Sequence, residues 1–395
     1  MSPLARHARL ALFLCGCAAF LNLYATQGIL PVFAADFAVS VREAGWSITV
    51  TTLAVALGAP FTSRLTSAWD QRRVIVLAAL ALALPAGLVT CAGNLAQLLL
   101  WRFVEGLLIP LVFATSVAYI GDRWRGGLVT EVTSLYVAGT VLGGFAGRLL
   151  TGVATQYLGW REAFALLAGL SLLLGLAIHW LLPANPPAAE RHLAERRGSW
   201  RPLCGKPLLA SYAVGFCVLF AQVATFTYAG LYLGLPPFEL GPAALGALYG
   251  VFLLALVVIP LAGRLSKSRP QAELLLVAAS LGVCGSALSL LSSLWLMVLG
   301  LALSSTGVFL AQAAANAFIS ASAGPDKARA VGLYLTCYYL GGSAGAVLPA
   351  ALWNRWGWPG CVALILVSQV LAPLIGWHGW RAPRPRQQLA PPRTT

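Results

Sequence analysis

The sequence predicts an all-α membrane protein with 12 transmembrane helices, arranged as two pseudo-symmetric six-helix bundles with both termini in the cytoplasm. Three observations predict this fold. The 395 residues are 59% hydrophobic and only 10% charged, with a mean hydropathy of +0.81, whereas soluble domains carry roughly 25% charged residues. Long charge-free runs recur along the chain, and one stretch is repeated about half a chain later. Such a composition suits a surface that faces lipid.

The charge-free runs define the helices, because about 20 helical residues cross the core of a bilayer. Leu10–Ala35, Ala44–Ser63 and Leu240–Gly263 each suffice for one crossing. The 52 uncharged residues of Leu274–Pro325 are too many for one helix and are expected to turn at Ser292–Ser293. The predicted spans are 10–33, 44–64, 74–92, 97–120, 130–152, 161–182, 208–233, 242–263, 273–291, 294–319, 330–352 and 358–379.

The positions of lysine and arginine give the orientation. With a cytoplasmic N-terminus, 21 of the 26 basic residues fall in cytoplasmic segments and only Arg42, Arg161 and Arg355 fall outside, while Arg102 and Arg148 lie within spans. Cytoplasmic loops of membrane proteins carry an excess of basic residues. The formal charge of +14 is therefore a topology signal, and we expect no nucleic-acid partner.

The widest polar break divides the chain into two halves. We expect an N-terminal six-helix bundle at 1–182, a cytoplasmic linker at 183–207, a C-terminal six-helix bundle at 208–380 and a disordered basic tail at 381–395. The apolar run that follows Arg9 is too long for the core of a signal peptide, so we expect it to be retained as the first helix.

An internal repeat supports a duplicated half. Ser134–Trp160 and Gly332–Trp358 share ten identities in twenty-seven ungapped positions. Both copies place small residues four apart: Gly139, Gly143 and Gly147 in the first, Cys337, Gly341 and Gly345 in the second. Such a small-residue face lets helices in lipid approach closely.

Twelve spans in two related halves, joined by a central basic loop, resemble the major facilitator superfamily of secondary transporters over nearly the whole chain. The repeated segments, Phe226–Ser266 and Arg102–Gly106 (RFVEG) are similar to its bacterial YnfM-like efflux branch, which is related to drug:proton antiporters. The resemblance implies a central cavity lined by helices 1, 4, 7 and 10, opened alternately to each side as the two halves rock.

Two cytoplasmic loops carry altered forms of the family's gating signature. The loop after the second span reads SRLTSAWDQRRV and keeps Arg72 and Arg73, while its counterpart after the eighth span reads GRLSKSR and keeps Gly263 and Arg264. A serine and a lysine occupy the positions where the signature has an acid. The resemblance implies a gating role for the four retained residues, with a latch built differently from the family's usual one.

One acidic residue, Glu105, lies deep in a predicted span, and Asp36 lies at the outer end of the first span. A charge at the bilayer centre costs at least ~2.5–3.5 kcal/mol, so such a residue is functional or paired. Arg102 lies on the same helical face as Glu105 and matches the family's R-x-x-x-G motif, which is associated with proton coupling. We predict that Glu105, Arg102 and Asp36 couple transport to protons; a permanent Arg102–Glu105 ion pair is the alternative.

Arg148 has no acidic partner on its own helix and stands where the antiporter signature G-P-x-x-G-G has its last glycine; the proline is also missing from Gly143–Arg148. Three interpretations remain open. The side chain could pair with Glu105 or Asp36, attract an anionic substrate, or extend outward to the membrane surface.

Neutral polar side chains in the spans are the remaining candidates for the cavity lining. For each of them, hydrogen bonding between helices is as plausible as substrate contact. Together with Arg148, the predicted cavity residues are Asn22, Thr26 and Gln27 in the first span, Tyr119 in the fourth, Gln222, Thr225 and Tyr228 in the seventh, and Gln312 and Asn316 in the tenth.

These observations predict a monomeric, multi-pass protein of the bacterial inner membrane that exports a small organic solute, such as a drug, sugar or metabolite, by proton antiport. A proton symporter or a facilitator is the alternative. We expect no enzymatic activity, no cofactor and no metal site, because ATP-binding, nucleophile and metal-ligand motifs are missing and the eight cysteines are scattered through apolar runs. The partners are lipid, the solute and protons.

Overall fold

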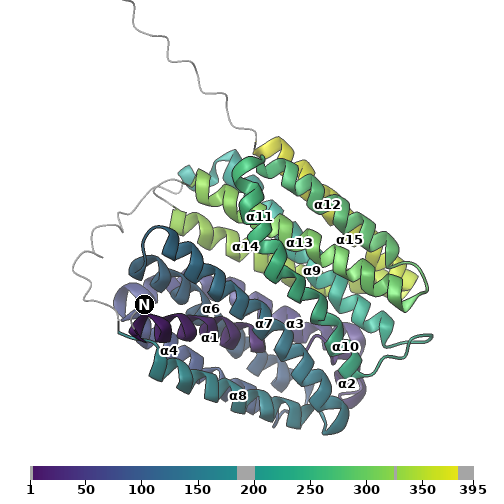
Figure 1. The fold of residues 1–395 in the computed structure, drawn as a ribbon. Helices are drawn as coiled ribbons and strands as arrows, with labels where there is room; N and C mark the ends of the chain where they lie inside the picture. The colour runs from purple at the N-terminus through teal and green to yellow at the C-terminus, as the bar shows by residue number, and fades with distance from the viewer. Residues whose placement is uncertain (1–2, 185–200, 324–326, 381–395) are drawn as a thin grey trace, which may run out of the picture.

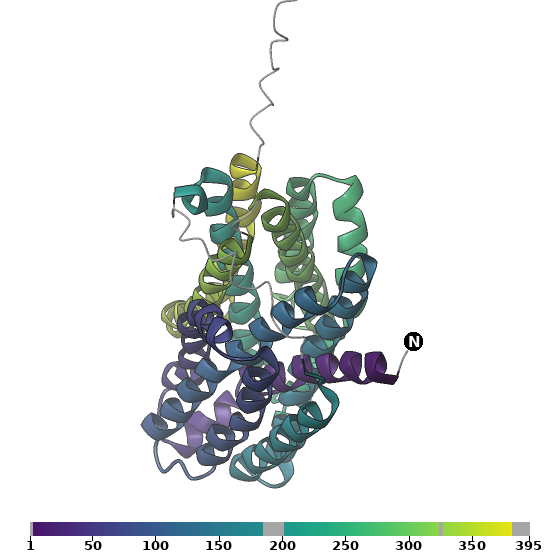
Figure 2. The ribbon, with the colours of Figure 1, turned by 90° about the vertical axis from the view of Figure 1, so that its left-hand side faces the viewer.

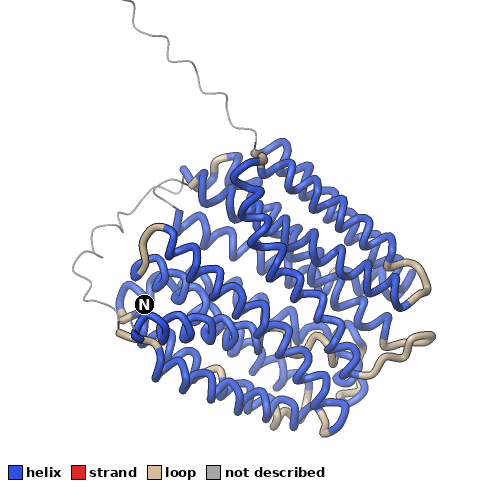
Figure 3. Tube along the Cα trace, in the orientation of Figure 1, coloured by secondary structure: helices blue, strands red, loops and turns tan. Residues whose placement is uncertain are grey.

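The computed structural model describes residues 3–184, 201–323 and 327–380, and within these ranges the regular secondary structure is exclusively helical (Figure 3). The predicted tail at 381–395 and the middle of the predicted linker lie outside the described residues. An all-α fold is thereby confirmed.

The helices form two groups, coloured purple to teal and teal to yellow in Figure 1. Seen from the side that carries the N-terminus, one group lies above the other (Figure 2). The first group contains α1 (Pro3–Leu23), α2 (Leu30–Asp36), α3 (Val41–Ala68), α4 (Gln71–Ala81), α5 (Ala83–Val89), α6 (Leu95–Arg123), α7 (Gly127–Tyr157) and α8 (Trp160–Leu181). The second contains η2 (Arg201–Cys204), α9 (Lys206–Leu233), α10 (Pro242–Leu248), η3 (Tyr249–Leu254), α11 (Ala255–Ser268), α12 (Gln271–Leu288), α13 (Leu294–Ser322), α14 (Lys327–Val347) and α15 (Pro349–Gly379).

Ten helical segments of the described chain are long and apolar enough to cross a membrane. The predicted spans at 10–33 and 330–352 are not among them, although α1 and α14 have 21 residues each. The span predicted at 10–33 is divided into α1 and α2 by a non-helical turn over residues 24–28, where Thr26 and Gly28 have low helix propensity. The count of twelve crossings stays a prediction.

The small-residue faces of the repeated segments make the same contact in both groups of helices. In α7, a Cβ added to Gly143 or Gly147 would lie 2.5 and 1.9 Å from the carbonyl oxygens of Cys17 and Leu21 in α1. In α14, a Cβ added to Gly341 would lie 2.1 Å from the carbonyl oxygen of Phe216 in α9. Each repeat therefore packs its backbone directly on the first helix of its own group, as the spacing predicts.

The ends of several helices meet where α8 ends and α9 begins, and we call this end of the molecule the linker face. Arg72 at the start of α4 donates from Nε to the carbonyl oxygen of Leu182 (2.6 Å) and from Nη2 to that of His179 (2.8 Å). Trp380, directly after α15, donates from Nε1 to Ser211 Oγ in α9 (2.9 Å). The other predicted gating residues make fewer contacts: the backbone N–H of Arg73 is capped by Asp70, whereas Gly263 and Arg264 are exposed.

We expect Gly341→Ala to lower the stability of the protein and Gly332→Ala, in the same helix, to leave it unchanged or higher. Alanine favours a helix over glycine by about 1 kcal/mol, so helix propensity alone would raise the stability of both variants. At Gly341 the new methyl group meets a backbone carbonyl, and overpacking costs roughly 1–3 kcal/mol; at Gly332 nothing lies within 4 Å. Thermal unfolding in detergent measures the difference, and equal behaviour of the two variants would contradict the packing argument.

Candidate functional site

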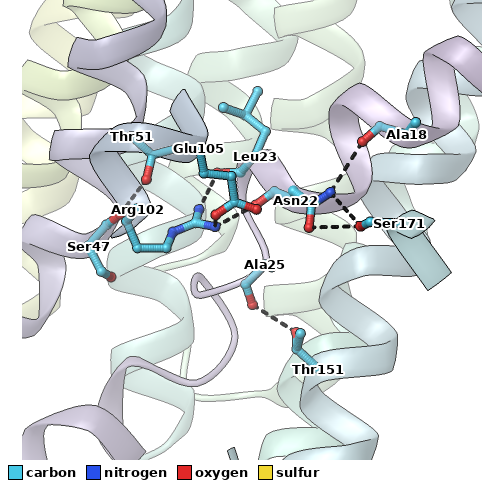
Figure 4. Close-up of polar contacts among 10 residues, drawn as sticks. All are labelled: Ala18, Asn22, Leu23, Ala25, Ser47, Thr51, Arg102, Glu105, Thr151 and Ser171. Atoms are coloured by element: carbon cyan, nitrogen blue, oxygen red, sulfur yellow. Dashed lines mark hydrogen bonds and ion pairs between the residues drawn. The ribbon is translucent and has the colours of Figure 1, made fainter. Parts of the chain in front are cut away.

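Arg102 and Glu105 form an ion pair in the interior of the first group of helices. Both side chains are fully buried, and Arg102 Nη1 lies 2.5 Å from Glu105 Oε2. Helix α6 brings them together because residues three apart share a face. The predicted pairing on one helical face is what the structure shows (Figure 4).

Arg102 also binds the end of helix α1. Its Nη1 donates to the carbonyl oxygen of Asn22 (3.0 Å) and its Nη2 to that of Leu23 (2.9 Å). The last carbonyls of a helix have no partner within the helix and carry partial negative charge. Arg102 therefore compensates two sources of negative charge, Glu105 and the interrupted first helix, as Figure 4 shows.

Several buried polar atoms around this pair have no hydrogen-bond partner among the described residues. They are Glu105 Oε1, Arg102 Nε and Ser47 Oγ; Thr26 Oγ1, in the turn over residues 24–28, is likewise without one. Ser47 and Thr51 of α3 lie beside Arg102 in Figure 4. An unpaired buried polar atom costs about 1–3 kcal/mol, and the second oxygen of Glu105 lacks a donor among the described residues that would stabilise its negative charge.

Arg148 lies at the other side of the break in the first span. Its Nε donates to Gln27 Oε1 (3.0 Å) and its Nη1 to the carbonyl oxygen of Gly144 (2.7 Å). Its guanidinium carbon lies 4.7 Å from the ring centre of Tyr24, 4.6 Å from that of Tyr249 and 5.1 Å from that of Phe252. The predicted pairing with Glu105 or Asp36 is not found among the described residues, and the side chain, 4% exposed, does not extend outward.

Asp36 lies apart from the buried pair. It follows the turn in the first span, its side chain is 40% exposed, and it accepts hydrogen bonds from Trp160 Nε1 (2.9 Å) and Arg161 Nη1 (3.3 Å). These contacts tie the end of α2 to the start of α8 at the surface. Among the described residues no contact links Asp36 to Glu105, and the proton-coupling role of Asp36 stays a prediction.

Two predicted cavity residues are directed into the first group of helices. Asn22 is fully buried and donates to Ser171 Oγ in α8 (2.9 Å). Tyr119 is fully buried, and its hydroxyl donates to the carbonyl oxygen of Pro183 (2.8 Å) at the linker face. Sequence periodicity places both in spans but does not say which face of a helix is turned toward the second group.

Other predicted cavity residues lie where the two groups meet or in the second group. Gln27 Nε2 donates to Thr227 Oγ1 in α9 (3.0 Å), and Tyr228 donates to the carbonyl oxygen of Ala346 in α14 (2.8 Å). Thr225 is buried with its hydroxyl unpaired, Gln222 and Gln312 are partly buried, and Asn316 is exposed.

The two groups of helices contact each other closely at the end remote from the linker face. Helix α7 packs against α10, where a Cβ on Gly152 would lie 2.4 Å from the carbonyl oxygen of Pro242. Thr52 of α3 and Ser343 of α14 share a hydrogen bond of 2.8 Å. The sequence analysis did not select Thr52, Ser343, Tyr249 or Phe252, because a hydroxyl or ring in an apolar helix gives no signal of its own partner.

Comparison with known proteins identifies the family. A profile of the Major Facilitator Superfamily matches residues 12–346 and, in a second match, residues 238–394. The chain belongs to the Major Facilitator Superfamily. It is 32% identical to the inner membrane transport protein YnfM of Escherichia coli (strain K12) over 373 residues, which is 93% of this chain and 89% of YnfM.

Two further proteins show the breadth of the likeness. A chloramphenicol efflux pump of Mycobacterium tuberculosis is 29% identical over 361 residues, covering 86% of this chain and 84% of the pump. The crystal structure of a bacterial homolog of the human lysosomal transporter Spinster, in an inward-facing and occupied conformation, has a TM-score of 0.77 at 14% identity, covering 96% of this chain and 98% of that one. This facilitator-superfamily protein is therefore a multi-pass transporter of the bacterial inner membrane, and not an enzyme.

In this transporter the hydrogen bonds from Arg102 to the end of α1 form a cap on that helix. We expect this cap to contribute to stability separately from the Arg102–Glu105 ion pair. Glu105→Met leaves a buried charge without its partner, which costs about 3–5 kcal/mol. Adding Arg102→Met removes that charge but leaves the carbonyl oxygen of Leu23 without its donor, at about 1–3 kcal/mol, whereas that of Asn22 keeps the backbone N–H of Ala25 (3.2 Å). The free energy of unfolding in detergent should therefore recover only in part, and full recovery in the double variant would show that the cap contributes nothing.

Proposed function

We propose that the protein exports a small organic solute by alternating access, driven by proton entry, with Glu105 as the proton-carrying group. The buried Arg102–Glu105 pair is the observation that carries this proposal. Glu105 has one oxygen held by Arg102 and one without a partner, so the carboxylate can accept a proton without first losing its position.

Protonation of Glu105 would act on the first span through Arg102. When Glu105 is neutral, the attraction that holds Arg102 to it weakens, and the carbonyl oxygens of Asn22 and Leu23 become the stronger partners of the guanidinium. The adjacent turn over residues 24–28 connects this cap to Gln27 and the second group of helices. A charge change in α6 thereby alters the balance between two conformations, which is what coupling requires.

The remaining parts of the proposal follow the family. We propose twelve crossings with both termini in the cytoplasm, so that the linker face is cytoplasmic and the remote end, closed in this structure, faces outward. The solute would bind between the two groups near Gln27, Thr225, Tyr228 and Gln312. The protein would act as a monomer, without a bound cofactor, because the proton gradient supplies the energy.

A symporter or a facilitator is the second candidate. It is favoured by the altered signature in the fifth span, where Gly143–Arg148 lacks the proline of antiporters and ends in arginine. One relative favours export: the Mycobacterium tuberculosis relative is a chloramphenicol efflux pump.

Glu105→Gln should abolish proton-driven transport while leaving exchange of solute across the membrane. Glutamine keeps the shape and can accept from Arg102 but cannot carry a proton. The test uses proteoliposomes and radiolabelled chloramphenicol, ethidium, benzoate and arabinose, first to find which the wild type moves, then to compare gradient-driven uptake with counterflow. Glu273→Gln, which alters an exposed acid at the start of α12, is the matched control. Proton coupling unchanged in Glu105→Gln would reject this mechanism, and transport indifferent to an imposed pH gradient in the wild type would favour the facilitator.

A further inference from the structure

We infer that Arg148, enclosed by Tyr24, Tyr249 and Phe252, is an anion-binding site and that the transported solute is an organic carboxylate with an aromatic or planar body. This inference names the substrate class and rests on the transport function proposed above. It follows from the electrostatics of Arg148, the geometry of its rings and the place of the site between the two groups of helices.

The charge of Arg148 is not neutralised by the described part of the protein. It donates hydrogen bonds to an amide oxygen of Gln27 and to the carbonyl oxygen of Gly144, which are dipoles without net charge. The other buried arginine, Arg102, has the carboxylate of Glu105, and the surface residue Arg161 has Asp36. A buried cation without an anion is costly to maintain, so a counter-charge brought by a ligand would be strongly favoured here.

The rings determine what kind of anion fits. Ring centres at 4.6–5.1 Å from the guanidinium carbon stabilise the cation through their π faces without neutralising it. The carbonyl oxygen of Gly144 in α7 accepts a hydrogen bond from Nη1, and Gln27 accepts one from Nε. No hydrogen bond from Nη2 to the described residues is found, so this edge of the guanidinium is free to bind a ligand. Arginine presents parallel N–H donors to a carboxylate, and a flat body attached to that carboxylate would enter apolar, aromatic surroundings.

The site lies between the two groups of helices, where a transported solute must pass. Arg148 and Tyr24 belong to the first group, and Tyr249 and Phe252 of η3 belong to the second. A ligand held here contacts both halves at once, so its binding free energy can depend on their relative position. An anion leaving the cytoplasm and a proton entering it both move charge in the direction favoured by an inside-negative membrane potential, which agrees with export by proton antiport.

Cationic drugs should be excluded by the same charge. The aromatic cage that would otherwise receive a quaternary ammonium or a planar cation is already filled by the guanidinium of Arg148. The inference therefore separates this transporter from exporters of cationic dyes.

The test compares benzoate, benzamide and benzamidine, three probes of nearly the same size with charges of −1, 0 and +1. Binding to the purified wild-type transporter is measured by its thermal shift and by competition with radiolabelled benzoate. We expect benzoate to bind at least about 10-fold more tightly than benzamide, the range given by one hydrogen bond to a charged group, and benzamidine to bind more weakly still. Equal binding of the three probes, or no binding of benzoate, overturns the inference without requiring any variant.

Three variants test whether the preference for the anionic probe depends on Arg148. Arg148→Gln should abolish it, and Gln27→Glu should abolish it as well, because the new carboxylate beside Nε supplies the missing counter-charge. Arg161→Gln alters an arginine that lies 4.2 Å from the ring centre of Trp160 and should keep the preference. Benzoate preference retained in Gln27→Glu contradicts the inference even if Arg148→Gln fails to fold.

The two proposals fail separately. Proton-driven transport of other solutes with no preference for benzoate would reject the anion site and leave proton coupling intact. A clear benzoate preference in a protein whose Glu105→Gln variant still responds to the proton gradient would reject the coupling mechanism and leave the anion site intact.

Discussion

The requirement that every charge inside the bilayer be compensated shapes the interior of this transporter. Arg102 meets it within the protein, through Glu105 and the carbonyl oxygens of Asn22 and Leu23. Water cannot serve these groups in the hydrocarbon core, so the break in the first span is tolerated because a guanidinium covers the end of α1. The helix interruption and the ion pair thus depend on one side chain.

The two halves share a packing plan but not a distribution of charge. In both, the glycines of a later helix lie directly on the backbone of the first helix of the group. The titratable and cationic groups that lie deep within helices, Glu105, Arg102 and Arg148, belong to the first group, whereas the polar groups of α9 and α13 are neutral. If Glu105 carries the proton and Arg148 binds the solute, as proposed, the first group handles both charges, because identical packing does not require identical side chains.

Sequence alone predicted what depends on local spacing. The helical class follows from uncharged runs long enough to cross a bilayer. The glycine faces of α7 and α14 and the Arg102–Glu105 pair follow from intervals of three or four residues. Contacts between distant segments could not be predicted in this way: the reach of Arg102 to Asn22, the rings around Arg148 and the burial of Tyr119 against Pro183 depend on how helices are rotated about their axes. The interruption at residues 24–28 was hidden for the same reason, since an apolar run has the same composition whether or not its helix is continuous.

The contacts at the closed end have a consequence for the conditions under which the protein can work. Gln27 with Thr227, Thr52 with Ser343, and Gln156 with the backbone of Ala243 are hydrogen bonds between neutral groups, and the charge of Arg148 is shielded from solvent by rings. Dissolved ions screen exposed charges but have little effect on neutral or buried partners. In the proposed orientation this end faces the cell's surroundings, so its closure would hold equally well in a dilute medium and in a saline one.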